Sequence, residues 1–139
     1  MAIKIIGIIS NSGNDNICLV RHGDLEFSAE VDFNGALEKD SEYFFEMGYE
    51  AIEEIVKVQI FEDSMSGIFP TSSENELCVV GRVSGIFREN NIELIDLYIQ
   101  RGPEFITIDR KDIPIGNYDL HDGVKIVFKN LKFYAHDKM

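Results

Sequence analysis

Leu25-Glu26-Phe27-Ser28-Ala29-Glu30-Val31-Asp32-Phe33 is the stretch of sequence that decides the fold class. Apolar side chains occupy every odd position, and polar or acidic side chains occupy every even one. A period of two is the signature of a β-strand with one face on a core and the other in solvent. The stretch therefore predicts a strand whose outer face carries three carboxylates.

Similar patterns continue on both sides of this strand. Residues 3–10 form a short β-branched run, and residues 16–22 are suited to pair with it as a hairpin. Four later runs are rich in β-branched and aromatic residues, and turn-forming residues separate them; they are 77–87, 92–100, 104–109 and 124–134. Connections this short favour antiparallel pairing. They predict a mostly antiparallel, curved or barrel-like β-sheet.

Residues 41–57 carry a different pattern, which predicts one amphipathic helix. Their apolar stripe has a spacing near 3.6 residues and consists of Phe45, Tyr49, Ile52 and Val56. Asp40 or Ser41 would cap its first turn. The acidic residues off the stripe are Glu46, Glu50, Glu53 and Glu54. The predicted fold class is therefore α+β, with this helix packed on the sheet.

The chain length fits one domain spanning residues 1–139. Domains most often have roughly 100–150 residues, and the 45% of apolar residues can build a core without disulfide or metal staples. A faint echo links residues 3–33 to 77–109, through Ile6-Gly7 and Val80-Gly81 and then Asn16-Ile17 and Asn91-Ile92. Chance recurrence of a strand–turn–strand pattern is favoured here over an ancient duplication.

The cellular compartment of the protein is predicted from its first residues and from its cysteines. The first residues show no secretory pattern, and no segment approaches the roughly 20 apolar residues that cross a bilayer. Cys18 and Cys78 each lie in an apolar run, which predicts free buried thiols. We expect a cytoplasmic protein without a membrane association.

Catalytic and cofactor-binding motifs are missing from the sequence. No serine stands in a G-x-S-x-G elbow, and neither phosphate-binding glycine pattern occurs. His22 and His121 lie in turn-like stretches, and their spacing is not that of metal ligands. We expect no enzyme activity, no cofactor and no metal.

Charge is the most informative feature that remains. The net charge is -12, and residues 24–76 hold fifteen acids against two bases, whereas residues 77–139 hold nine of each. Such a negative field repels phosphate backbones and anionic membranes and attracts basic proteins. The alternative interpretation is that the acids only keep a small protein soluble.

In size, charge and lack of catalytic motifs, the chain resembles bacterial immunity proteins and antitoxins. The resemblance implies a non-catalytic inhibitor that binds and neutralises a basic toxin or nuclease. The sequence does not predict its oligomeric state. The surface expected to face the partner consists of Glu26, Glu30, Asp32, Glu46, Glu50, Glu53 and Glu54.

A second interpretation concerns the basic and aromatic second half, which is similar in texture to an OB-type barrel that binds single-stranded nucleic acid. Its aromatic residues are Phe105, Phe128, Phe133 and Tyr134. The interleaved bases are Arg101, Arg110, Lys111, Lys125, Lys129 and Lys132. Lysines at alternate positions also protect ordinary edge strands, and this half is neutral overall. Nucleic-acid binding is therefore the less favoured interpretation.

Overall fold

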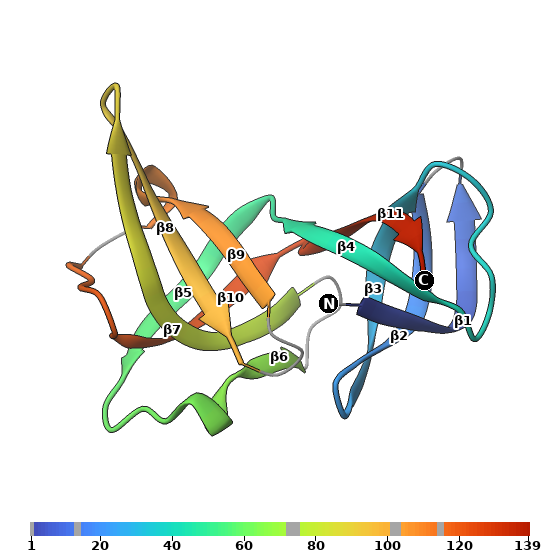
Figure 1. Ribbon diagram of the computed structural model, residues 1–139, viewed down its shortest axis with the longest axis horizontal. Coiled ribbons are helices and arrows are strands. Elements are labelled where there is room, and N and C mark those ends of the chain that lie inside the picture. The colour runs from blue at the N-terminus through green and yellow to red at the C-terminus, as the bar shows by residue number, and fades with distance from the viewer. Residues whose placement is uncertain (1, 13–14, 72–75, 101–103, 114–115) are drawn as a thin grey trace.

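The computed structural model of the protein describes residues 2–12, 15–71, 76–100, 104–113 and 116–139. Strands account for 69% of the chain and helical turns for 5%, so the protein is nearly all β. Two sheets lie side by side, and chain segments pass between them (Figure 1). Among the described residues, no helix has the length and apolar character needed to cross a bilayer.

The first sheet is a closed five-stranded barrel. Its members are β1 (Ala2–Ser12), β2 (Asp15–His22), β3 (Leu25–Phe33), β4 (Glu42–Gly48) and β11 (Lys132–Lys138), in the order β1-β2-β3-β11-β4. All pairs are antiparallel except β11 with β3, which run parallel. The inward side chains of Ile5, Val20, Val31 and Phe133 are fully buried, because side chains of a barrel strand point alternately to the interior and the exterior.

The second sheet is open. Its order is β5 (Ala51–Val58), β10 (Gly123–Lys129), β7 (Glu76–Glu89), β8 (Ile92–Ile99) and β9 (Glu104–Asp109), and the short β6 (Gly67–Pro70) pairs with β7. Two single 3₁₀ turns, η1 (Asp63–Met65) and η2 (Arg110–Asp112), lie in its connections. Its inner face contributes Val79, Leu97, Ile126 and Phe128 to the same core cluster as the barrel.

The two sheets are built by a reciprocal exchange of strands. In each half of the chain, three strands form an antiparallel meander (β1-β2-β3 and β7-β8-β9), and a fourth strand, β4 or β10, pairs with the first. The fifth strand crosses into the other sheet: β5 joins β10, and β11 joins β4 and β3 (Figure 1). The crossings touch, because Glu50 N donates to Lys129 O over 3.1 Å. The meanders contain the two echoing segments, and the duplication itself stays a prediction.

The predicted helix at residues 41–57 is wrong, because these residues form β4 and β5. The chain breaks at residues 49–50, and a bulge leaves Glu53 without an opposite residue between the Ile52–Phe128 and Glu54–Val127 pairs. Both irregularities shift the phase of the alternation. Inward residues consequently fall at Phe45, Tyr49, Ile52 and Ile55, a spacing that imitates a helix.

Residues 124–134 also differ from the prediction, because they are divided between β10 (Gly123–Lys129) and β11 (Lys132–Lys138), which lie in different sheets. Val56, on the predicted apolar stripe, is 46% exposed, and the α+β class is replaced by an all-β one. The strand-rich character is confirmed, as are the strand at Leu25–Phe33 and the hairpin before it. Cys18 and Cys78 are free and buried as predicted. The turn expected at residues 102–103 lies outside the described residues.

Candidate functional site

The seven carboxylates predicted to face a partner lie in several places. Glu30, Asp32 and Glu46 come together on the outer face of the barrel, on β3 and β4. Glu26 lies at the start of β3, Glu50 at the crossing between the sheets, and Glu53 and Glu54 on β5. The structure therefore assembles three of the seven into one group and separates the other four from it.

Strand β11 is the element that brings the three carboxylates together. It lies between β3 and β4, and Tyr134 is opposite Asp32 on one side and Glu46 on the other. Two residues earlier on β11, Lys132 is opposite Glu30. Side chains in directly opposite positions on one face lie about 5 Å apart at Cβ, so they interact. We call this group, with Phe44 and His136 beside it, the acidic barrel face.

Lys132 neutralises the acidic barrel face only in part. Its Nζ lies 3.6 Å from Asp32 Oδ2 and 3.9 Å from Glu30 Oε1, and 5.4 Å from the centre of the Tyr134 ring. Three carboxylates against one lysine leave a net charge of two negative units on a small area of sheet. These side chains stand on a closed barrel, so their spacing is held by the strand ladder.

Aromatic rings lie exposed among these charges. Tyr134 is 45% exposed and Phe44 is 39% exposed, and Phe44 stacks on His136 with ring centres 6.4 Å apart. Gly48 makes room for the Tyr134 ring, since a Cβ there would lie 2.9 Å from its Cε2. Exposed aromatic rings beside charged groups are typical of surfaces that bind proteins.

The remaining predicted carboxylates have other surroundings. Glu26 pairs with Arg21 at 3.0 Å, and Glu50 accepts a hydrogen bond from the Asn130 amide. Glu53 and Glu54 are exposed at the bulge of β5, which is an edge strand of the open sheet. Glu26 lies on the same outer face of β3 as Glu30, but at the other end of the strand, and Glu53 and Glu54 lie in the other sheet, so none of them joins the group around Tyr134.

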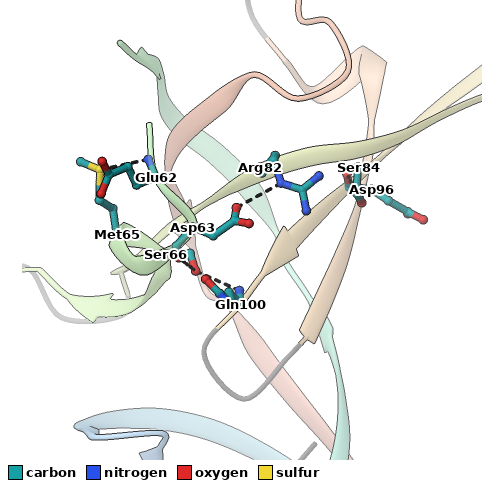
Figure 2. A network of polar contacts seen from close by, with 8 residues as sticks. All are labelled: Glu62, Asp63, Met65, Ser66, Arg82, Ser84, Asp96 and Gln100. Atoms are coloured by element: carbon teal, nitrogen blue, oxygen red, sulfur yellow. Dashed lines mark hydrogen bonds and ion pairs between the residues drawn. The ribbon is translucent and has the colours of Figure 1, made fainter. Parts of the chain in front are cut away.

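A polar network that the sequence analysis missed ties η1 to the open sheet (Figure 2). Arg82 Nε donates to Asp63 Oδ1 over 3.1 Å, and the guanidinium lies 5.3 Å from the centre of the Tyr98 ring. Ser66, 1% exposed, donates to Asp63 O and accepts from Gln100 N. Because both partners of the Ser66 hydroxyl are backbone groups, it fixes a loop and is not a nucleophile. Asp63 and Arg82 are 19 residues apart, and Ser66 and Gln100 are 34 apart, so no sequence motif joins them.

His22 is a buried titratable side chain at the end of β2. It is 1% exposed, its ring lies edge-on to Phe45 with centres 5.7 Å apart, and Nε2 has no hydrogen-bond partner among the described residues. Burial lowers the pKa of His22 to about 4, so the ring is neutral at pH 7. Within the described part of the chain, no three His, Cys, Asp or Glu side chains are grouped as metal ligands.

The residues of the nucleic-acid interpretation are dispersed. Phe128 and Phe133 are fully buried in the core, so neither ring is available to stack on a base. Lys132 belongs to the acidic barrel face, and Arg110 donates to the carbonyls of Ile113 and Gly116. Phe105 and Tyr134 remain exposed, on different sheets. Arg101 lies outside the described residues.

The core of the open sheet contains a small apolar cavity. It is lined by Ile55, Ile95, Ile108 and Ile126 among others, and its volume is about 10 Å³. This is the space of about one water molecule, and its lining offers no polar partner to a water. The cavity is a packing gap and holds no ligand of metabolite size.

Comparisons with known proteins give no family. No protein-family model matches the chain, and no curated protein sequence matches it. One solved structure is similar in shape: the cytoplasmic molybdate-binding protein ModG with molybdate bound, at 14% identity and a TM-score of 0.48 over 95% of this chain and 92% of that one. A likeness at this level carries no argument about ligand or function.

Proposed function

We propose that this protein is a non-catalytic binding module that docks a basic protein partner through the acidic barrel face. The module acts as an immunity protein or antitoxin does. Its partner is a basic toxin or nuclease, which it neutralises by binding. The observation that supports the proposal is the grouping of Glu30, Asp32 and Glu46 around the exposed Tyr134, where Lys132 balances one of the three negative charges.

Two physical effects favour this function. A net charge of -12 attracts a basic partner over long range and speeds association at low salt. At contact, a rigid tyrosine provides apolar area with little loss of side-chain entropy, and the surrounding carboxylates pair with lysine or arginine. The same charge repels nucleic acid and anionic lipid.

The proposal is tested with two triple variants of equal charge. The first, Glu30→Gln with Asp32→Asn and Glu46→Gln, removes the carboxylates of the acidic barrel face. The second, Glu26→Gln with Glu53→Gln and Glu54→Gln, removes three carboxylates that lie elsewhere. Wild type and both variants are immobilised at low salt, basic proteins from a lysate are captured, and the eluates at rising salt are identified by mass spectrometry.

We expect one stoichiometric basic protein on the wild type and on the second variant, and its loss from the first. With that partner purified, its association rate should fall roughly tenfold or more for the first variant only. Equal losses from both variants would mean that only total charge matters and would refute the acidic barrel face. Recovery of single-stranded nucleic acid in place of a protein would favour the nucleic-acid interpretation.

A further inference from the structure

Strand β9 leaves one edge of the open sheet unpaired. It pairs with β8 alone, and Asp109 N donates to Tyr49 Oη over 3.1 Å instead of to β8. Along a strand, the backbone groups of alternate residues point to the same side. The N–H and C=O groups of Phe105 and Thr107 therefore point away from β8, as those of Asp109 do.

Side-chain contacts between β8 and β9 support this assignment. Residues whose backbone groups point away from each other form the close pairs of an antiparallel ladder, with Cα atoms about 4.5 Å apart. Thr107 Oγ1 donates to Asp96 Oδ1 over 2.7 Å, and the rings of Tyr98 and Phe105 are 5.1 Å apart. None of the turn and loop hydrogen bonds among the described residues reaches Phe105 or Thr107.

Two other edge strands of this sheet are protected against pairing. Strand β5 carries a bulge with Glu53 and Glu54, and β6 has four residues and ends in Pro70. Bulges, charges, proline and short length are the usual protections of an edge strand. At the edge-facing positions 105 and 107, β9 has none of them, and Phe105 is 55% exposed.

We propose that the β9 edge binds a second copy of this chain by antiparallel β9–β9 pairing across a twofold axis at Ile106. Phe105 of one copy then lies opposite Thr107 of the other, and each of these two pairs makes two N–H···O=C hydrogen bonds. A register centred on Thr107 is poorer, because it places Phe105 opposite Asp109, whose N–H is bound by Tyr49. The backbone groups that are free at the β9 edge therefore favour the register centred on Ile106.

Charge matching favours a second copy as the occupant. A neutral strip at the twofold axis brings no like charges opposite each other, so it can dock on itself. Phe105, Ile106 and Thr107 form such a strip on a molecule of net charge -12. The facing aromatic and β-branched side chains form a favourable cross-strand pair. Repulsion between the two acidic molecules makes this contact stronger as salt rises, whereas docking on the acidic barrel face weakens.

The test is sedimentation velocity over a range of protein concentrations at low and high salt. The variants are Phe105→Lys and Thr107→Pro, which add a charge or remove the edge-facing N–H. The matched control is Phe87→Lys, because Phe87 is also 55% exposed but lies on β7, opposite Leu94 of β8 and away from the β9 edge. We expect a wild-type dimer that tightens with salt. The dimer Kd should rise at least about tenfold for both edge variants and remain unchanged for the control.

Amide hydrogen exchange on the wild type keeps the proposal falsifiable if an edge variant does not fold. Exchange at Phe105 and Thr107 should slow at least about tenfold between dilute and concentrated solution, since pairing occupies both N–H groups. A monomer at all concentrations, with no change in exchange, would overturn the proposal. Equal weakening by Phe87→Lys and Phe105→Lys would also overturn it, because the contact would then be the outer sheet face. Failure of the β9–β9 dimer would not contradict the proposed binding of a basic partner by the acidic barrel face.

Discussion

Strands β3 and β9 occupy the same place in the two halves of the chain, but only β3 has a neighbour on both sides. In the barrel, β11 pairs with β3 in parallel, through Lys132–Glu30 to Ala135–Phe33. In the other sheet, the corresponding strand β5 pairs with β10 alone. Ile113 and Tyr118, which follow β9, pack on the core at this side and line its cavity together with Ile55 and Ile108.

The difference shows that one strand order can produce two architectures. The exchanged strand closes the sheet when it reaches the third strand of the other half, and it leaves an open sheet when it does not. Closure removes both edges and presents a continuous outer face, where the acidic barrel face is assembled. The open sheet retains free edges, one of which lacks protection.

The largest expected effect compares two buried phenylalanines, one in each sheet. Phe133 in the barrel and Phe128 in the open sheet are both fully buried. Truncation to alanine should cost about 3–5 kcal/mol of unfolding free energy in each, and the barrel variant should lie toward the upper end. A closed barrel relaxes less around a cavity than an open sheet. Urea unfolding of Phe133→Ala and Phe128→Ala measures this, and a larger loss for Phe128→Ala would contradict the comparison.

An intermediate effect concerns the last residue of β2 in the barrel, which is the titratable His22. The last residue of β8 in the open sheet is Ile99, which does not titrate. The pKa of His22 falls to about 4 in the folded protein from 6.5, so below pH 6.5 the unfolded chain binds a proton first. Stability should therefore be constant above pH 6.5 for this group. It should decline by up to about 3 kcal/mol as the pH falls to 4.

Urea unfolding from pH 7 to pH 4 checks the titration of His22. His22→Leu should flatten this part of the profile, because the neutral ring is replaced by an apolar side chain of similar size. His121→Gln is the control, since His121 is exposed. Profiles of equal slope for wild type and His22→Leu would show that the decline comes from other groups.

The smallest effect concerns one glycine in each sheet that lies beneath an exposed ring. A Cβ at Gly48 would lie 2.9 Å from Tyr134 Cε2, and one at Gly85 would lie 2.8 Å from Phe87 Cε2. Each ring can swing into solvent, so Gly48→Ala and Gly85→Ala should each cost less than about 1 kcal/mol. Only Gly48→Ala should weaken binding of a basic partner, because Tyr134 belongs to the acidic barrel face. Equal binding by both variants would remove Tyr134 from that surface.

Part of the candidate site could be found from sequence. The alternation at residues 25–33 placed Glu30 and Asp32 on an outer face, because a strand with period two leaves no other choice. Glu46 was assigned to a helix but lies on β4, and Tyr134 was assigned to a nucleic-acid surface. Neither could be joined to Asp32 beforehand, since β11 is about a hundred residues away from β3 in sequence.

The sequence by itself determined the strand-rich character, the buried free thiols and the concentration of acid in residues 24–76. These properties depend on the amino-acid composition and on the local spacing of apolar residues, and both can be determined before the fold is known. Tertiary structure alone decided that residues 42–58 are two strands, that the halves exchange strands, and which carboxylates share a face. The physical reason is that a strand's hydrogen bonds come from partners distant in sequence. A break and a bulge can then give a strand segment the apolar spacing of a helix.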